Sequence, residues 1–150
     1  VVLGASLADG SLDGKAQAQL AGAAQGMDLT LHRCFDLVPD MGKALEAAVD
    51  LGFHRILTSG AAATAEVGTE RLAALVAQAA GRIVIMPGAG VTAANVGRLL
   101  GLGMDEVHGS CSVSEAANGP EAGFGFGPAV ARRTDASTVR AVKRAMEAAG

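Results

Sequence analysis

Two histidines and an aspartate are the residues of this chain best suited to proton transfer. His32 and Asp36 lie four positions apart, and His108 follows much later. Histidine is the side chain that ordinarily titrates closest to neutral pH, so a pair of histidines could act as acid and base. Asp36 or Glu106 could orient one imidazole or take a proton itself. The sequence therefore predicts His32, Asp36 and His108 as catalytic residues, although each histidine alone could equally be a hydrogen-bonded structural residue.

A glycine turn suggests a second chemistry, the binding of an anion. The apolar run from Ile83 to Met86 leads into Pro87-Gly88-Ala89-Gly90, and we expect a helix from about Thr92, with Thr92 as its N-cap. Without a Cβ at Gly88 and Gly90, backbone N–H groups can approach a ligand closely, and a helix N-terminus adds partial positive charge. The alternative is an ordinary tight turn between a strand and a helix.

Further polar residues fall where other strands are expected to end. Function in parallel α/β folds collects at the carboxyl ends of the strands. We therefore predict a set of ligand-binding residues at one rim: Arg33, Thr58, Ser59, Gly60, Gly88, Gly90, Asn95 and Ser110. Arg33 could instead point outward and pair with a helix carboxylate, Asp36 could simply shape its loop, and Thr58-Ser59-Gly60 could be a plain turn.

The elements that must position these residues alternate between strand and helix. Short apolar or β-branched runs predict five strands, at Val1–Ala5, Leu29–Phe35, Arg55–Ser59, Ile83–Met86 and Glu106–Ser110. They begin about 22 to 28 residues apart, which is the period of βα units in a parallel sheet. Two architectures have this pattern, a doubly wound open sheet and a (β/α)8 barrel.

The helices between these strands have recognisable caps and apolar faces. Asp13, Asp40 and Asp135 are expected N-caps, and Gly52 is expected to end the second helix. The first helix should turn five residues inward: Ala16, Leu20, Ala23, Ala24 and Met27. The glycine-rich stretch from Asn118 to Gly127, with Phe124 and Phe126, is predicted to be a loop that could cover the site. The last helix should bury Val139, Val142 and Met146 and expose a basic face.

Composition excludes several classes of protein. The chain has 150 residues, 50% of them hydrophobic, which suits one folded domain and excludes a disordered tail. Its net charge is −3 and it has no Trp or Tyr, so nucleic-acid binding is not expected. No apolar run approaches the ~20 residues of a membrane helix. Cys34 and Cys111 form no CxxC or zinc pattern, which fits small packing residues in a reducing cytoplasm.

Several stretches together resemble the CutC copper homeostasis family. They are LHRCFD (31–36), ALEAAVDLGFHRILTSG (44–60), GRIVIMPGAGVTAANV (81–96) and EVHGS (106–110), in the order the family has them. The opening VVLGASLADGSLD is similar to the region of the family's fourth strand. The resemblance runs from Val1 to about Ser112 and returns faintly near the C-terminus.

The resemblance implies a fold and a function. It implies a partial (β/α)8 TIM barrel. Residues 1–150 would be a single, N-terminally truncated domain that contains strands four to eight of the barrel. The resemblance also implies a cytoplasmic protein that forms homo-oligomers. It also implies copper homeostasis through Cu(I) binding or buffering, with copper as ligand. Cys34 and Cys111 fall where the family commonly has alanine, so the metal ligands stay unassigned. The residues themselves suggest an alternative, an enzyme that acts on a small anionic or phosphorylated substrate by His/Asp acid–base chemistry.

Overall fold

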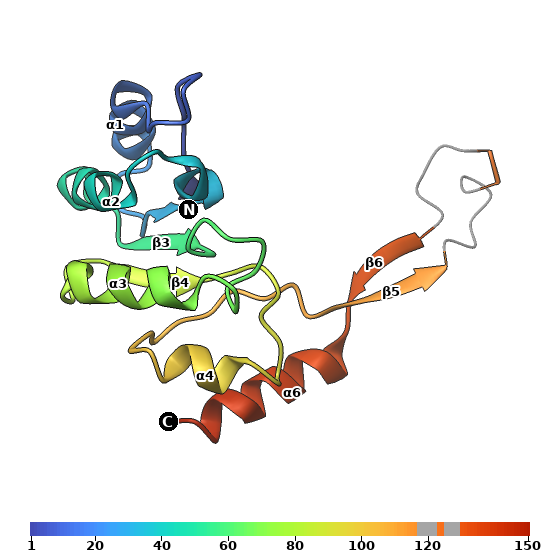
Figure 1. Ribbon diagram of the computed structural model, residues 1–150. Helices are drawn as coiled ribbons and strands as arrows, with labels where there is room; N and C mark the ends of the chain where they lie inside the picture. The colour runs from blue at the N-terminus through green and yellow to red at the C-terminus, as the bar shows by residue number, and fades with distance from the viewer. Residues whose placement is uncertain (117–122, 125–129) are drawn as a thin grey trace.

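A four-stranded parallel sheet with helices packed against it forms the body of the protein in this computed structural model, which describes residues 1–116, 123–124 and 130–150. The strands lie in the order β1 (Val2–Leu3), β2 (Thr30–Leu31), β3 (Arg55–Thr58) and β4 (Val84–Pro87) (Figure 1). The helices are α1 (Gly14–Ala23), α2 (Met41–Asp50), α3 (Thr69–Ala79), α4 (Val96–Leu100) and α6 (Ala136–Glu147), and Arg33–Leu37 forms the 3-10 helix η1.

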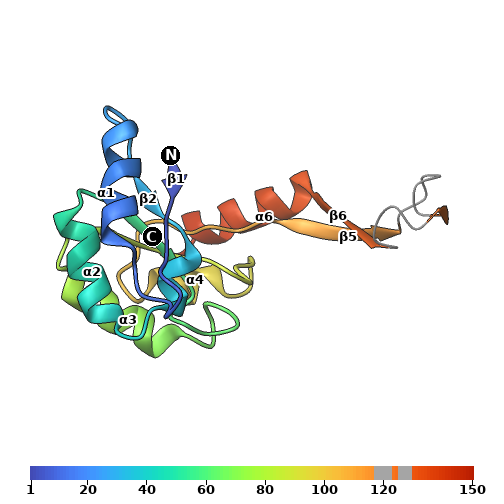
Figure 2. The same ribbon diagram turned by 90° about the horizontal axis from the view of Figure 1, so that it is seen from above.

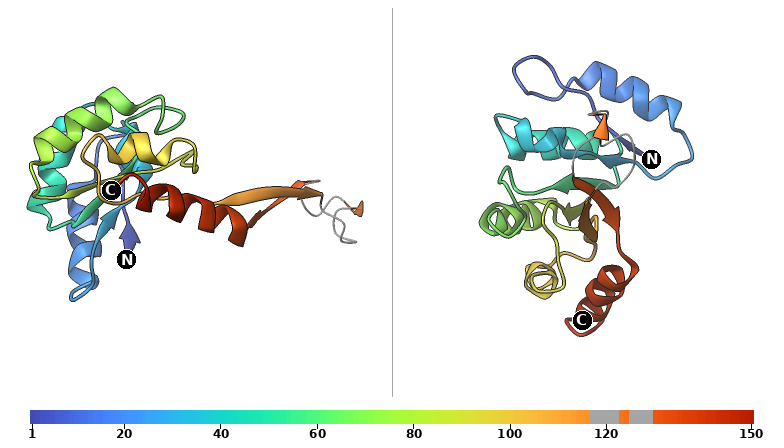
Figure 3. Two further views of the ribbon diagram at one scale, coloured as in Figure 1. Left: turned by 90° about the horizontal axis from the view of Figure 1, so that it is seen from below. Right: turned by 90° about the vertical axis from the view of Figure 1, so that its right-hand side faces the viewer.

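Strand order distinguishes the two architectures that the sequence left open. The strands are neighbours in chain order without a reversal, whereas a doubly wound sheet changes direction at a switch point. Connections between parallel strands are right-handed. When each connection leads to the next strand in the same direction along the sheet, all the connecting helices lie on one face. Figure 3 shows α1 to α4 following the strands in this way. The sheet is thus an open parallel arc, and the described residues form no closed barrel.

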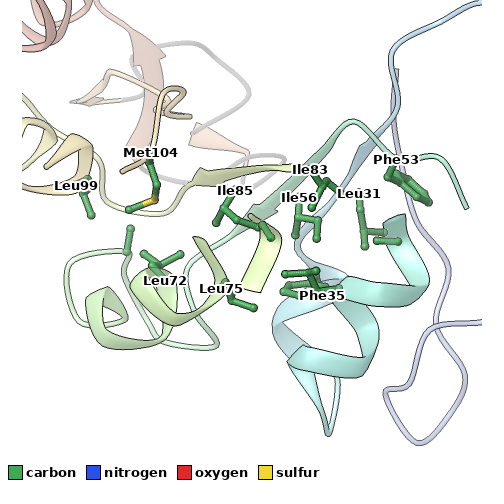
Figure 4. Packing of buried hydrophobic residues seen from close by; sticks show 14 of the residues in the cluster. Leu31, Phe35, Phe53, Ile56, Leu72, Leu75, Ile83, Ile85, Leu99 and Met104 are labelled. Atoms are coloured by element: carbon green, nitrogen blue, oxygen red, sulfur yellow. The ribbon is translucent and has the colours of Figure 1, made fainter. Parts of the chain in front are cut away.

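The hydrophobic core lies between the sheet and the helices. Leu31, Ile56 and Ile85 are aligned on neighbouring strands and are at most 3% exposed. They pack with Phe35 and with residues of α3 and α4 (Figure 4). The opposite face of the sheet is less covered, and Val2 is 60% exposed there at the edge strand.

The predicted N-caps are confirmed. The carboxylates of Asp13, Asp40 and Asp135 each accept a backbone N–H three residues later, from Ala16, Lys43 and Thr138. The apolar face predicted for α1 is wrong, because Leu20 is 40% and Met27 58% exposed while Gln17 is the buried residue of this helix. This helix follows the edge strand β1, and in the described part of the chain no strand lies beyond β1 to bury its outer side.

Two predicted strands are corrected by the structure. The second strand is limited to Thr30–Leu31, because the chain then turns into η1 and the alternation of faces expected up to Phe35 is lost. The segment Glu106–Ser110 is not a strand. It runs beside β4 but makes only one backbone hydrogen bond to it, from His108 N to Pro87 O at 2.9 Å, too few for a ladder.

An antiparallel hairpin was not predicted. Its strands β5 (Ser112–Ala116) and β6 (Val130–Thr134) project from the body, next to α6 (Figure 2). All five residues of β6 are exposed, so it lacks the buried apolar side that would have identified it as a strand. The loop expected at Asn118–Gly127 lies outside the described residues, except for Gly123 and Phe124. The last helix is confirmed, with Val142 buried.

Candidate functional site

Asp36 organises the carboxyl end of β3. Its carboxylate accepts hydrogen bonds from Thr58 Oγ1 at 2.5 Å, Ser59 N at 3.0 Å, Ala61 N at 3.0 Å and Arg33 Nε at 2.6 Å. The side chain is 7% exposed. Burial would by itself raise the pKa of Asp36, but these hydrogen bonds outweigh it and hold the pKa below its ordinary value. Asp36 is therefore a fixed carboxylate.

The N–H groups of the loop after β3 bind an anionic group of the protein itself, the carboxylate of Asp36. Ser59 N and Ala61 N both donate to Asp36, and Gly60 N donates to Thr58 Oγ1 at 2.9 Å. Thr58 and Ser59 are fully buried. We expected Thr58, Ser59 and Gly60 to bind an external ligand, but their donors are already used. These hydrogen bonds favour the alternative role for Asp36, in which its carboxylate shapes the loop after β3, over a role in proton transfer.

Gly68 is a residue of this region that the sequence reasoning missed. A Cβ at Gly68 would lie 1.9 Å from the carbonyl oxygen of Ser59. The position directly before α3 must therefore be glycine for the loop to close over Asp36. The sequence signal was present, since a glycine stands immediately before the helix that begins at Thr69.

Arg33 is held in one orientation at the same rim. Its Nε donates to Asp36 at 2.6 Å and its Nη2 donates to Ser59 Oγ at 2.7 Å. The side chain is 43% exposed, and Nη1 donates to no other described residue. Its partner carboxylate belongs to η1, not to a neighbouring α-helix. A planar guanidinium fixed in this way can bind a carboxylate or phosphate with the donors that remain free.

His32 caps η1 with its own side chain. The ring Nδ1 accepts the backbone N–H of Cys34 at 3.1 Å, and the residue is half-buried. The ring lies over Gly4, where a Cβ would come within 2.8 Å of its Cε1 atom. Because Leu31 faces the helices, His32 lies on the opposite face of the sheet.

His108 lies on this same face but far from His32. It is exposed, and its Cβ is 3.7 Å from where a Cβ of Gly88 would be, close to Leu57. The positions of β3 and β4 lie between the two histidines, so three strand spacings separate them by roughly 14 Å along the sheet. No hydrogen bond joins their side chains within the described residues. They are not a direct acid–base pair, and a ligand between them would have to bridge this distance.

Two expected neighbours of His108 have other partners. Glu106 accepts from Arg55 Nε at 2.6 Å, at the amino end of β3, so it cannot orient an imidazole at the carboxyl end. Ser110 is exposed, and its Oγ lies 3.0 Å from that of Ser112 at the base of the hairpin. The third histidine, His54, lies at the amino end of β3, where its Nδ1 accepts from Leu29 N at 3.0 Å.

The turn after β4 is only partly open to an anion. Gly88 N donates to Thr58 O at 2.9 Å, so this amide is not free. Asn95 is 8% exposed and braces the turn, donating to Gly90 O at 2.9 Å and accepting from Thr92 N at 2.8 Å. The predicted N-cap at Thr92 is wrong, because the Thr92–Asn95 turn delays the helix to Val96–Leu100, which is five residues long.

Free donors nevertheless remain in this turn. Ala89 and Gly90 both have positive φ, at 71° and 74°, and their amides donate to no other described residue. With Arg33 Nη1, these amides are donors near the carboxyl ends of the strands that no other described residue uses. An exposed N–H of this kind favours an anionic partner.

A metal centre is not formed by the residues that the structure describes. They contain no group of three or more His, Cys, Asp or Glu side chains close enough to hold a metal. Cys34 and Cys111 are free, half-buried and packed against the core, as predicted for small packing residues. Burial raises the pKa of the Cys34 thiol, which disfavours the thiolate that soft metals bind. Nor does any helix of the described segments have the length and apolarity to cross a membrane.

Sequential parallel strands with helices packed against them define an α/β protein, and the Asp36 network lies at the carboxyl edge of its sheet. This chain belongs to the CutC family, whose sequence model matches residues 1–113. The sequence identification is thereby confirmed.

Known relatives cover nearly the whole chain. It is 55% identical over 150 residues to a family protein CutC of Sinorhizobium medicae, covering 99% of this chain and 61% of the relative. It is 51% identical to one of Agrobacterium fabrum, covering 99% of this chain and 60% of the relative. A solved structure named as the copper homeostasis protein CutC of Streptococcus agalactiae matches 72% of this chain and 54% of its own, with 37% identity and a TM-score of 0.69. The chain thus spans about three fifths of the length of these curated relatives.

Proposed function

We propose that this chain binds a small anion, a carboxylate or a phosphate, at the carboxyl edge of its sheet. The observation that supports this most strongly is the Arg33 guanidinium, which Asp36 and Ser59 hold in place while Nη1 donates to no other residue that the structure describes. A guanidinium fixed before the ligand arrives loses little side-chain entropy on binding. Because Arg33 and Asp36 form an ion pair, the ligand would be bound mainly through the directed N–H donors of the guanidinium and not through a net positive charge.

The reaction class that suits this arrangement is acid–base chemistry on a small anionic or phosphorylated substrate. His108 is exposed on the same face of the sheet and forms no side-chain hydrogen bond with other described residues, so its imidazole is free to transfer a proton. In this proposal Arg33 and the Ala89–Gly90 amides bind the anion, and Asp36 is a positioning residue. His108 is the acid or base.

Replacing Arg33 by lysine tests the anion site. Lysine keeps the charge but has no planar fork, so it cannot hold Asp36 and Ser59 through two nitrogens while a third nitrogen is presented to the ligand. We expect the R33K variant to bind inorganic phosphate about tenfold more weakly than the wild type in a calorimetric or NMR titration. The matched control is Arg82→Lys, since Arg82 also bonds a carboxylate, that of Glu46 at 2.6 Å, but on the helical side. Equal phosphate affinity in R33K and R82K would contradict the proposal.

We propose further that the sheet is an arc of a (β/α)8 barrel in a longer protein. The sequential strand order, the exposed apolar residues near the β1 edge and the greater length of the relatives support this. In such a barrel the less covered face of the sheet would become the interior, and Arg33 and His108 would lie at its mouth. A structure determined at the full length of the relatives tests the arrangement.

Copper is the second candidate ligand, and the name of the solved relative is the observation that favours it. Cytoplasmic Cu(I) binding or buffering would make copper a cargo that needs thiolate or thioether ligands. The described residues fit this poorly, because neither Cys34 nor Cys111 belongs to a group of three or more His, Cys, Asp or Glu side chains among them.

The two thiols provide the test of copper binding. We expect the Cys34→Ser/Cys111→Ser double variant to keep the wild-type affinity for Cu(I), measured by competition with a chromophoric chelator under anaerobic conditions. Loss of one equivalent of bound Cu(I) in the double variant would instead establish the copper function for this chain. Single substitutions would then show which thiol carries it.

A further inference from the structure

We propose that His32 offers its Nε2–H to the bound anion as a neutral hydrogen-bond donor and does not act as a base. This inference rests on the anion site proposed above. It assigns His32 a role that differs from that of His108, although the sequence treats the two histidines alike.

The position of the proton follows from the cap of η1. His32 Nδ1 accepts the N–H of Cys34 at 3.1 Å. A neutral imidazole carries one proton, so with Nδ1 as acceptor the proton lies on Nε2. A proton on Nδ1 would remove the acceptor and leave the first turn of η1 without its cap. The structure therefore fixes one tautomer, in which neither nitrogen is free to accept a substrate proton.

The same tautomer argues against a metal at His32. A histidine that binds a metal through one nitrogen donates the N–H of the other to a neighbour. Here Nδ1 is an acceptor, so binding a metal at Nε2 would require an anionic ring. The fixed ring thus suits an anionic ligand and not a cation.

The ring is held where this donor can reach a ligand. The backbone N–H of His32 donates to Leu3 O at 3.0 Å, which ties the residue to β1. Gly4 leaves room for the ring in this position, since a Cβ there would lie 2.8 Å from both Cε1 of His32 and Sγ of Cys34. Nε2 donates to no other described residue, although His32 is half-buried. A half-buried donor without a partner on the face opposite the helices is suited to a ligand.

The donor also narrows the class of ligand. Arg33 follows His32 directly, so two donors from consecutive residues stand at the carboxyl end of β2, one charged and one neutral. A ligand that satisfies both must present unprotonated oxygens, as carboxylates and phosphate esters do. Proton transfer is then left to His108.

Nitrogen-15 NMR and a phosphate titration test this inference separately. Long-range 1H–15N spectra of the protein at pH 8 should show the His32 proton on Nε2. The variant His32→Asn keeps a side-chain oxygen near the position of Nδ1 for the cap but has no donor at the position of Nε2. We expect it to fold normally and to bind inorganic phosphate about tenfold more weakly.

His54→Asn is the matched control, because His54 also accepts a backbone N–H through Nδ1 but lies at the amino end of the sheet. Its phosphate affinity should equal that of the wild type. A proton on Nδ1 of His32, or wild-type affinity in H32N, would overturn the donor role while leaving the Arg33 site intact. If the wild type binds no phosphate, the proposed anion site and the donor role both fail, and only the tautomer stands.

Discussion

Replacing Asp36 by alanine is expected to destabilise the protein by about 3 kcal/mol, as the loss of one partner from a buried charged network does. The substitution leaves Arg33 without its carboxylate and the amides of Ser59 and Ala61 without an acceptor. These donors cannot all reach water, because Ser59 is fully buried. Urea denaturation followed by circular dichroism measures the change.

The same carboxylate makes stability depend on pH. The pKa of Asp36 is lowered in the folded state, so its contribution is fully present above the ordinary aspartate pKa. It is lost as the pH falls below about 4 and passes through the folded pKa. The difference between wild type and D36A should therefore shrink under acid conditions.

Asp40 provides the comparison for this prediction. It is also an aspartate whose carboxylate accepts a backbone N–H, from Lys43 at 3.0 Å, but it is exposed at the start of α2. Asp40→Ala removes a helix cap that water can replace in part, so its effect should be clearly smaller than that of D36A. Equal losses in the two variants would show that Asp36 is no more than a local cap.

Gly68→Ala is expected to lower the free energy of unfolding by about 3 kcal/mol or more. The substitution acts on the same loop after β3, because Gly68 packs against Ser59. The added methyl group would lie 1.9 Å from the Ser59 carbonyl oxygen and 2.9 Å from its carbon, both backbone atoms that cannot rotate away. Overpacking of this kind commonly costs about 1–3 kcal/mol, and a clash with backbone belongs at or above the upper end. Thermal unfolding and the phosphate titration both report on it, because displacing Ser59 also releases Arg33.

Gly22→Ala separates this clash from the general effect of replacing a glycine. Gly22 lies inside α1 and a Cβ there meets nothing within 4 Å. Alanine should therefore stabilise the helix by about 0.5–1 kcal/mol through its higher helix propensity. A G68A protein as stable as G22A would mean that the loop can move away from Gly68 without loss.

Within the site, the structure separates residues that bind one another from residues that are free to bind a ligand. Asp36, Thr58 and Ser59 satisfy each other, and Asn95 satisfies the turn after β4. Among the donors that no other described residue uses are Arg33 Nη1, His32 Nε2 and the amides of Ala89 and Gly90. All of these donors favour a negatively charged oxygen, and they therefore support the anion site and not the binding of Cu(I).

The sequence by itself determined what depends on near neighbours along the chain. The caps at Asp13, Asp40 and Asp135 are hydrogen bonds between residues three positions apart, which the local sequence predicts. The strands β3 and β4 were predicted from short apolar runs. The βα period predicted the parallel sheet, and the five quoted stretches, taken in order, identified the CutC family. These signals are local or are carried by residue identity, so no knowledge of packing was needed.

Only the tertiary structure decided which polar groups are still free. Asp36 reaches Thr58, Ser59 and Ala61, which lie more than twenty residues away, and Glu106 reaches Arg55 at the opposite end of the sheet. Gly68 matters only because Ser59 lies against it. A donor that already has a protein acceptor is less available to a ligand, and which acceptor it has depends on distances between segments that are far apart in the sequence.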